Sequence, residues 1–100
     1  MQLTDKTFQW TLDSESDCMV MFTGSWCPVC KQIEPYIKKL QNMLHASLYV
    51  LNIDRNKQVS TRYHIYGTPT FIRFHKGVEQ ERYTGAVTQD VIRGMAEVCR

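Results

Sequence analysis

Short uninterrupted apolar runs alternate along the chain with stretches whose apolar residues recur every three or four positions. Two of the runs, residues 18–22 and 48–53, lack the apolar–polar alternation of a half-buried strand, so we predict strands that are covered on both faces. Residues 70–74 form a further predicted strand. A turn at 75–77 and a polar segment at 79–84 follow it, which indicates a hairpin whose second strand lies at a sheet edge.

The longest helical pattern begins at Cys27 or Pro28. Proline is tolerated in the first turn of a helix, which suits Pro28. Pro35 falls inside the pattern and is expected to kink the helix, because it lacks an N–H and crowds the preceding turn. The apolar residues that define the pattern are Ile33, Tyr36, Ile37, Leu40 and Leu44.

Three shorter helices are also predicted, at residues 8–12, 57–64 and 88–98. We expect Thr4 or Asp5 to cap the first of them, since both side chains can accept a hydrogen bond from a free backbone N–H. The polar segment 54–56 is expected to cap the second. The last helix is predicted to begin at Thr88 or Gln89 and to have one apolar face, made of Val91, Ile92, Met95 and Val98.

This order of elements predicts an α/β fold with a central mixed sheet of four or five strands and helices on both faces. The strands should be parallel where helices connect them and antiparallel at the final hairpin. The chain has 100 residues, of which 43% are hydrophobic, values that suit one domain over residues 1–100 with one hydrophobic core.

Charge and hydropathy exclude several classes of partner. The net charge of +2 comes from scattered cations interleaved with acids, which does not provide the clustered basic surface that nucleic acids require. No apolar run approaches the roughly 18 residues that span a bilayer, so we expect no membrane partner. The first residues show no basic start followed by an apolar stretch, and we therefore expect a cytoplasmic protein without a secretory signal.

Cysteine spacing provides the candidate chemistry. Four cysteines are present: Cys18, Cys27, Cys30 and Cys99. In a reducing compartment, a Cys-x-x-Cys pair such as Cys27 and Cys30 is typically catalytic or metal-binding. A zinc site would need a second pair of ligands at a set spacing, which the three separated histidines do not supply. We expect no metal and no bound cofactor, a redox role for the pair, and packing roles for Cys18 and Cys99.

The pair lies where a buried strand gives way to a helix. The N-terminus of a helix has unpaired N–H groups and a partial positive charge, which favour a thiolate at Cys27. The pKa of a free cysteine is about 8.5, and Cys-x-x-Cys motifs lower it. We expect Cys27 to be exposed and to act as the nucleophile. Cys30, on the same helical face and more buried, would then resolve the mixed disulfide.

From about Leu3 to Val98, the sequence resembles the thioredoxin family. The matching motifs are Trp-Cys-x-x-Cys-Lys at 26–31, Pro35, Leu-Asn-Ile-Asp at 51–54, Gly-Thr-Pro-Thr at 67–70, Phe-x-x-Gly at 74–77 and Gly85-Ala86. The resemblance implies a thioredoxin fold and a monomeric enzyme that reduces protein disulfides. It also implies that an NADPH-dependent thioredoxin reductase restores the dithiol.

The resemblance further implies a cis peptide bond between Thr68 and Pro69, beside the cysteines. The backbone of Thr68 would then pair with an extended substrate segment, as an edge strand does. The residues expected to form this shallow substrate site are Trp26, Pro28, Val29, Tyr66, Thr68, Pro69, Gly85 and Ala86.

Several positions depart from the family pattern. Met21 and Val50 align with the buried Asp and Lys of the family, so the usual proton acceptor for Cys30 is missing. Glu34, four residues after Cys30, is a candidate replacement acting through a water, although a plain surface role fits it too. The family's strand Trp aligns with Thr23, and the Ile before its cis-proline with Thr68.

Residues 28 and 29 depart from the family as well, since Pro-Val stands between the cysteines where thioredoxins usually have Gly-Pro. With proline at position 28, directly after Cys27, the N–H groups of Val29 and Cys30 remain free to stabilise a Cys27 thiolate. Stabilising the reduced form makes the disulfide more oxidising, so we predict a reduction potential above the thioredoxin value of about −270 mV.

The sequence is compatible with two alternative functions. Pro28 also suits a glutaredoxin-like reductase that uses glutathione, although Trp26 stands where glutaredoxins usually have a smaller or phenolic residue. The loss of the buried Asp suits a thioredoxin-like binding subunit that does not need its thiols. A glutathione-linked assay and a variant lacking both cysteines would separate these functions from a protein-disulfide reductase.

Overall fold

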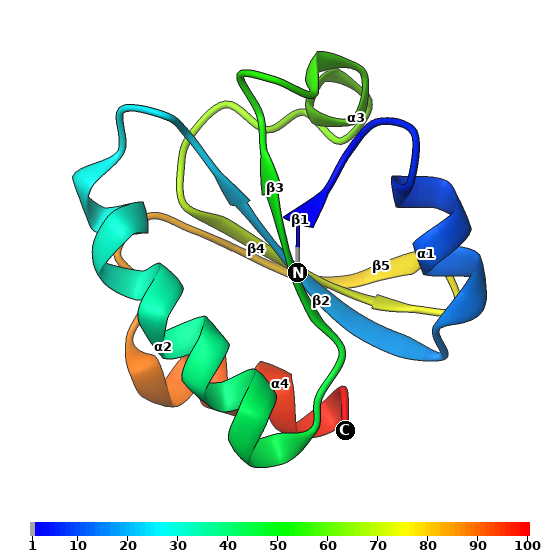
Figure 1. The fold of residues 1–100 in the computed structure, drawn as a ribbon, viewed down its shortest axis with the longest axis vertical. Helices are drawn as coiled ribbons and strands as arrows, with labels where there is room; N and C mark the ends of the chain where they lie inside the picture. The colour runs from blue at the N-terminus through cyan, green and yellow to red at the C-terminus, as the bar shows by residue number, and fades with distance from the viewer. Residues whose placement is uncertain (1) are drawn as a thin grey trace.

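A five-stranded mixed sheet forms the centre of the molecule, which the computed structural model describes over residues 2–100 (Figure 1). Its spatial order is β1-β3-β2-β4-β5, so the earliest and the latest strands form the edges. The strands are β1 (Gln2–Leu3), β2 (Asp17–Thr23), β3 (Leu48–Asn52), β4 (Thr70–His75) and β5 (Val78–Thr84). The predicted mixed sheet is confirmed, with its fifth strand supplied by β1.

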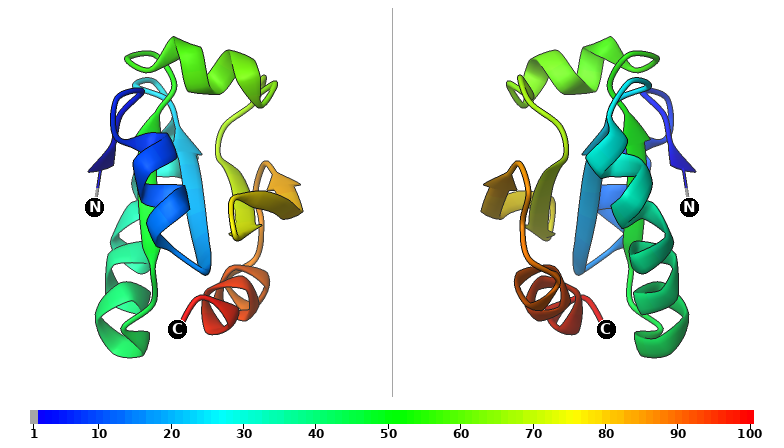
Figure 2. Two further views of the ribbon diagram at one scale, coloured as in Figure 1. Left: turned by 90° about the vertical axis from the view of Figure 1, so that its right-hand side faces the viewer. Right: turned by 90° about the vertical axis from the view of Figure 1, so that its left-hand side faces the viewer.

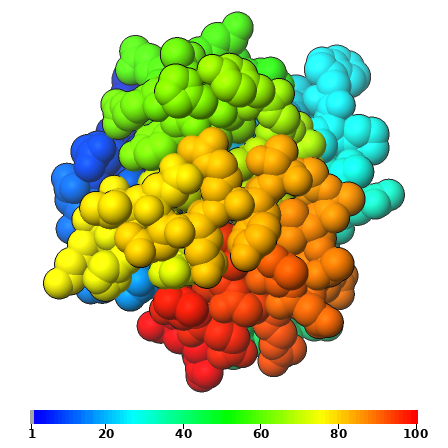
Figure 3. All heavy atoms as spheres, turned by 180° about the vertical axis from the view of Figure 1, so that it is seen from behind, coloured from blue at the N-terminus to red at the C-terminus, as the bar shows by residue number. Residues whose placement is uncertain are grey.

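Strand directions follow the connections between the strands. β3 is parallel to both β1 and β2, whereas β4 is antiparallel to β2 and to β5. Lys76 and Gly77 make the tight turn between β4 and β5, both with positive φ, which confirms the predicted hairpin. β5 is largely exposed, and Figure 3 shows this segment (yellow) crossing the surface of the molecule.

Helices cover both faces of the sheet, as predicted (Figures 1 and 2). α1 (Phe8–Ser14) and α3 (Lys57–Arg62) share a core cluster with one face. α2 (Pro28–Leu44) and α4 (Gln89–Val98) share a second cluster with the other face. Within residues 2–100, no helix is long and apolar enough to cross a membrane.

The central strand β2 explains why an uninterrupted apolar run appears in the sequence. Met19 and Met21 point to the side of α2 and α4, and Val20 and Phe22 point to the side of α1 and α3. All four side chains have an exposed fraction of 0%. Because successive side chains of a strand face opposite ways, a strand covered on both faces has no polar positions to alternate.

Of the two caps predicted for the first helix, Thr4 accepts a hydrogen bond of 3.3 Å from the Thr7 N–H in the turn that leads into α1, whereas Asp5 does not cap this helix. Thr7 occupies the N-cap of α1 without a side-chain hydrogen bond. Asp5 instead accepts hydrogen bonds from the backbone N–H groups of Gln58 (3.3 Å) and Val59 (3.0 Å), in the first turn of α3. The pairing of β1 with β3 brings Asp5 beside the start of α3, so it caps a helix more than 50 residues away in sequence.

The expected cap of α3 by segment 54–56 is also wrong at the level of side chains. Asn56 takes the N-cap position, but its side chain makes no capping hydrogen bond. Its amide instead donates to the Asn52 carbonyl and accepts from the Asp5 N–H, both at 2.9 Å. The Asn56 side chain therefore joins the ends of β1 and β3, leaving the cap of α3 to Asp5.

α4 begins as predicted, with Thr88 at its N-cap accepting a hydrogen bond from the Val91 N–H. The predicted apolar face is wrong at one position, since Val98 is 50% exposed. Ala96 is fully buried instead. It stands four residues after the buried Ile92, so these two side chains lie on the same helical face.

Candidate active site

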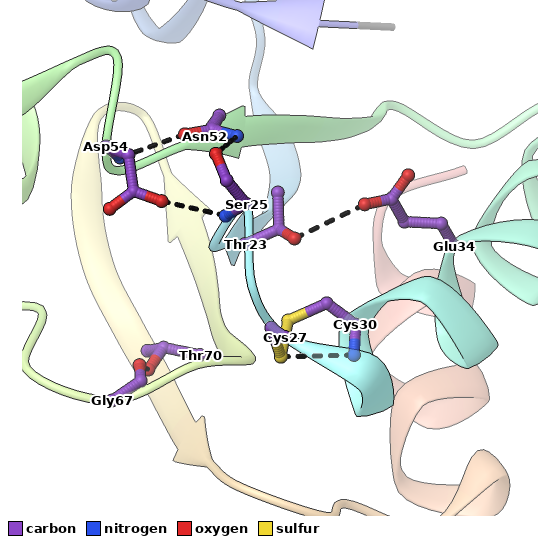
Figure 4. The surroundings of a disulfide bond; sticks show 9 residues. All are labelled: Thr23, Ser25, Cys27, Cys30, Glu34, Asn52, Asp54, Gly67 and Thr70. Atoms are coloured by element: carbon purple, nitrogen blue, oxygen red, sulfur yellow. Dashed lines mark hydrogen bonds between the residues drawn. A yellow bond between two sulfur atoms is a disulfide. The ribbon is translucent and has the colours of Figure 1, made fainter.

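Cys27 and Cys30 form a disulfide at the start of α2, in the loop that follows β2 (Figure 4). Their Cα atoms lie 5.2 Å apart, within the usual range for a disulfide. Cys27 occupies the N-cap of α2, Pro28 follows in the first turn, and Cys30 lies three residues on. The motif spacing alone therefore brings the two sulfur atoms together, as the sequence predicts.

The Cys27 sulfur takes the place that a capping oxygen has in other helices. Cys27 has an extended backbone, and its Sγ accepts a hydrogen bond of 3.2 Å from the Cys30 N–H. Pro28 has no N–H, so position 28 itself adds no unpaired donor to the first turn. Free N–H groups and the helix dipole favour negative charge at this position, which suits a thiolate once the disulfide is reduced.

The burial of the pair corrects one expectation. Cys27 was expected to be exposed, but its exposed fraction is only 8%, and that of Cys30 is 0%. Cys27 is covered because its side chain folds back over the first turn of α2 and joins the core cluster beneath that helix. The predicted ranking of the two cysteines is confirmed, since Cys27 is the more accessible one.

The exposed surface around the disulfide is largely aromatic and aliphatic. The exposed fractions are 93% for Trp26, 88% for Tyr66 and 37% for Val29. Pro28 is exposed as well. Exposed aromatic side chains next to a functional group are the usual composition of a surface that binds another protein.

Two further loops meet beside the disulfide. The Thr68–Pro69 peptide bond is cis, and the Pro69 carbonyl accepts a hydrogen bond of 2.8 Å from the Gly85 N–H. Pro69 is buried, whereas Ala86, which follows Gly85, is exposed. The hydrogen bond joins the loop after α3 to the loop after β5, two segments far apart in sequence.

Gly24 lets the loop before the cysteines approach Thr68 closely. A Cβ atom at position 24 would lie 3.3 Å from the Thr68 Oγ1, tighter than ordinary van der Waals contact. A side chain at position 24 would therefore require the Thr68 side chain to shift by a few tenths of an ångström. Figure 4 shows Gly67 and Thr70 on the side of the disulfide away from Glu34.

Beneath the disulfide the core is apolar. Met21 is 0% exposed, Val50 is 8% exposed, and the two face each other in the register between β2 and β3. Both belong to the core cluster that contains Cys27 and Cys30. The side of Cys30 that faces the sheet therefore has no ionisable neighbour at these two positions.

Glu34 extends from α2 toward the end of β2. Its Oε1 accepts a hydrogen bond of 3.3 Å from the Thr23 hydroxyl. Thr23 is 4% exposed and Glu34 is half-buried, so the pair lies at the edge of the core. The sequence singles out Glu34 but does not predict its hydrogen bond with Thr23. Figure 4 shows the carboxylate directed toward Thr23.

A polar network that sequence reasoning missed anchors the loop before Trp26. The Asp54 carboxylate accepts a hydrogen bond of 2.7 Å from the Ser25 N–H, and the Asn52 amide donates to the Ser25 hydroxyl at 3.2 Å. The hydrogen bond from the Ser25 N–H lowers the pKa of Asp54 below its usual range. Asn52 and Asp54 belong to the Leu-Asn-Ile-Asp motif, which was the available signal.

The remaining cysteines lie in the core. Cys18 and Cys99 are 1% and 2% exposed, which confirms the predicted packing roles. Burial raises the pKa of each thiol to about 12, so both stay protonated at neutral pH. Their free, neutral thiols contrast with the disulfide of Cys27 and Cys30.

Comparison with known proteins agrees with this geometry. A family model described as thioredoxin matches residues 1–97. The chain belongs to the thioredoxin family. It is similar to a thioredoxin H-type from Fagopyrum esculentum, with 30% identity over 97 residues that cover 96% of this chain and 84% of that protein. It is also similar to thioredoxin 1 from a Nostoc species, with 32% identity over 91% of this chain and 88% of that one.

Solved structures of thioredoxins share the fold. A mutant thioredoxin from Halobacterium salinarum superposes with a TM-score of 0.89 at 20% identity, covering 99% of this chain and 88% of the other. The thioredoxin fold predicted from the sequence is confirmed. Family membership together with the adjacent cysteine pair makes this protein a thiol–disulfide oxidoreductase, as thioredoxins are.

Proposed function

We propose that this thioredoxin-family protein works as a reductase of protein disulfides, with Cys27 as the nucleophile and Cys30 as the resolving residue. The observation that carries the proposal is the position of Cys27 at the N-cap of α2, with the Cys30 N–H 3.2 Å from its sulfur. That position stabilises negative charge on the Cys27 sulfur, and Cys27 is also the more exposed of the two cysteines.

The reaction consists of two exchanges. The Cys27 thiolate attacks a substrate disulfide, so that a mixed disulfide forms and the first substrate thiolate leaves. The Cys30 sulfur then attacks the Cys27 sulfur, closing the disulfide seen in the structure and releasing the second substrate thiolate. The substrate gains two electrons and two protons, and the protein dithiol loses them.

The surface around the disulfide supports a protein substrate. Trp26, Val29 and Tyr66 offer exposed apolar area, and the backbone of Thr68 lies next to the cis-proline. An extended segment of the substrate would pair with the Thr68 backbone as an added strand, with its side chains against the apolar surface. Gly85 and Ala86 would form the far side of this site.

Regeneration of the dithiol needs an external electron donor. By analogy with the thioredoxins to which the chain is similar, we propose an NADPH-dependent thioredoxin reductase as the donor and a monomer as the working form. We propose a reducing compartment such as the cytoplasm as the setting. Buried free thiols at Cys18 and Cys99 suit such a compartment.

Trapping of the mixed disulfide tests the assignment of roles. The variant Cys30→Ser should form a stable mixed disulfide with a disulfide-containing test peptide, because Cys27 attacks and nothing resolves the product. The variant Cys27→Ser should form none at neutral pH. Mass spectrometry of the adducts decides the matter, and an adduct carried mainly by residue 30 would contradict the proposal.

Turnover assays test the two alternatives. A reductase of the proposed kind turns over repeatedly when NADPH and a thioredoxin reductase regenerate its dithiol. It does not turn over when glutathione and its reductase are supplied instead. Preference for glutathione would support the glutaredoxin-like alternative. If the double variant Cys27→Ser, Cys30→Ser kept the protein's function in its host, the binding-subunit alternative would replace the proposal.

A further inference from the structure

The second exchange requires the Cys30 thiol to lose a proton. Cys30 attacks as a thiolate, so its proton must pass to an acceptor while the bond between its sulfur and the Cys27 sulfur forms. The bond from Cys27 to the substrate sulfur breaks in the same step, and the leaving substrate thiolate takes up a proton. Because Cys30 is fully buried, solvent does not reach its sulfur directly.

Within residues 2–100, the core cluster on the side of Cys30 that faces the sheet holds no carboxylate or histidine to act as an acceptor. Met21 and Val50 occupy that side and are both apolar and buried. Asp54, at the end of β3, is engaged elsewhere, since its carboxylate accepts the Ser25 N–H. The hydrogen bond also lowers the pKa of Asp54, which makes it a weak base.

Glu34 is half-buried and lines two grooves at the surface. It follows Cys30 by four residues on α2, and residues at that spacing are neighbours on a helix surface. Its carboxylate does not extend freely into solvent, because Oε1 accepts the hydrogen bond from Thr23. Figure 4 shows the carboxylate turned toward the end of β2.

Thr23 is fixed firmly enough to hold that carboxylate. It is the last residue of β2 and is 4% exposed. Its carbonyl accepts a hydrogen bond of 2.9 Å from the Ile53 N–H, which ties its backbone to β3. A buried hydroxyl needs a hydrogen-bond partner, and for Thr23 that partner is Glu34.

A groove connects this pair to solvent. It has a volume of about 660 Å³ and is lined by Thr23 and Glu34 together with other polar residues, among them Ser25 and Asn52. A polar groove of this size has room and partners for ordered water, which can pass a proton between groups that do not touch. Three cationic side chains line this groove or the adjoining one around Glu34: Lys31, Lys38 and Arg55.

We propose that Glu34 accepts the Cys30 proton through an intervening water and that Thr23 is the positioning residue that holds the Glu34 carboxylate in place. The proposal deepens the proposed reductase function and rests on it. The carboxylate takes the proton as the new disulfide forms, and then returns it to the departing substrate thiolate or to solvent. No oxidant is needed beyond the substrate disulfide.

Single-turnover kinetics test the proposal, with the reduced protein mixed against a disulfide-containing test peptide. Quenched-flow mass spectrometry follows the mixed disulfide as it forms and decays, which separates the two exchanges. Glu34→Gln should slow the decay about 100-fold or more at pH 7, because a positioned general base typically contributes about 10²- to 10⁴-fold. The loss in rate should shrink as the pH rises, because the Cys30 thiol then loses its proton more readily without a general base.

Two variants at position 23 isolate the positioning role. Thr23→Val keeps the shape but removes the hydroxyl, and should slow the decay in the same pH-dependent way as Glu34→Gln. Thr23→Ser keeps a hydroxyl and should restore most of the rate. Glu97→Gln, which alters a carboxylate on the surface of α4, is the matched control and should change neither exchange.

The outcomes distinguish this proposal from the function on which it rests. If the wild-type protein forms no mixed disulfide, the reductase function itself is wrong. If Glu34→Gln forms the mixed disulfide normally and its decay has the wild-type rate and pH profile, the role of Glu34 is overturned. If Glu34→Gln slows the decay but Thr23→Val does not, the positioning role of Thr23 is overturned. If Thr23→Val loses its near-ultraviolet circular dichroism, it has lost its native packing, and Thr23→Ser decides instead. The mixed disulfide of Thr23→Ser should decay within twofold of the wild-type rate, and a larger loss would overturn the positioning role.

Discussion

The Asp54 carboxylate accepts a hydrogen bond of 2.7 Å from the Ser25 N–H, two residues before Cys27. The bond ties the loop after β3 to the loop that carries the nucleophile. Asp54 is itself oriented by its neighbour, since its N–H donates to the Asn52 side-chain oxygen at 2.9 Å. The position of the cysteine pair therefore depends on two adjacent β-strand ends, which a parallel sheet places at the same edge.

Removing this anchor should loosen the loop. In Asp54→Ala, we expect the Ser25 amide to exchange with solvent hydrogen about tenfold faster than in the wild type, because a charged acceptor is lost. Asp54→Asn keeps an oxygen acceptor and should have a smaller effect. Amide exchange measured by nuclear magnetic resonance checks this, and equal exchange rates in the Ala variant and the wild type would contradict it.

The same bond should give the loop a defined pH dependence. The hydrogen bond from Ser25 lowers the pKa of Asp54 from its ordinary value of 3.8, so the folded state favours the carboxylate. The stabilisation is therefore complete above pH 3.8 and is lost as the pH falls through the lowered pKa. We expect protection of the Ser25 amide to persist at pH 4 and to decline below that value.

The four cysteines should differ sharply in reactivity. Burial raises the pKa of Cys18 and of Cys99 to about 12, so their unreactive thiol form dominates below that pH. Native, reduced protein at pH 8 should accept iodoacetamide at Cys27 first and then at Cys30. Cys18 and Cys99 should react only after a denaturant is added. Peptide mapping of the alkylated protein checks the order, and early labelling of Cys99 would show that the end of α4 opens.

An acid beneath the disulfide should not be tolerated. Met21→Asp would place a carboxyl at a site with an exposed fraction of 0%, beside the apolar Val50. An unpaired buried charge costs about 3–5 kcal/mol of stability, whereas the volume-conserving Met21→Leu should cost less than about 1.5 kcal/mol. Burial raises the pKa of a carboxyl, so the loss should grow as the pH rises above ~4. Denaturant unfolding at pH 4 and pH 7 measures both effects.

The reduction potential should lie above the thioredoxin value of about −270 mV. One feature supports this expectation: the Cys30 N–H points at the Cys27 sulfur, where it stabilises a thiolate. The buried, apolar Met21 beneath Cys30 opposes it, because desolvation disfavours a thiolate at Cys30. A shift of 30 mV corresponds to about 1.4 kcal/mol, which a single hydrogen bond can supply. Equilibration with a dithiol of known potential measures it, and a value at or below −270 mV would refute the argument.

The sequence alone determined the features that depend on near neighbours. Uninterrupted apolar runs predicted β2 and β3, and a spacing of three and four residues predicted the long helix that begins at Pro28. The pairing of Cys27 with Cys30 followed from their spacing at a helix start. All of these depend on the geometry of one strand or one helical turn, which local residues fix.

Only the tertiary structure decided which distant groups meet. Asp5 caps α3 rather than the helix that follows it, because β1 pairs with β3. Thr23 and Glu34, eleven residues apart, meet because α2 packs back along the sheet from the end of β2. Each contact joins polar groups that have several possible partners in an extended chain. Packing of the two apolar faces of the sheet selects one of them, and no local pattern encodes that choice.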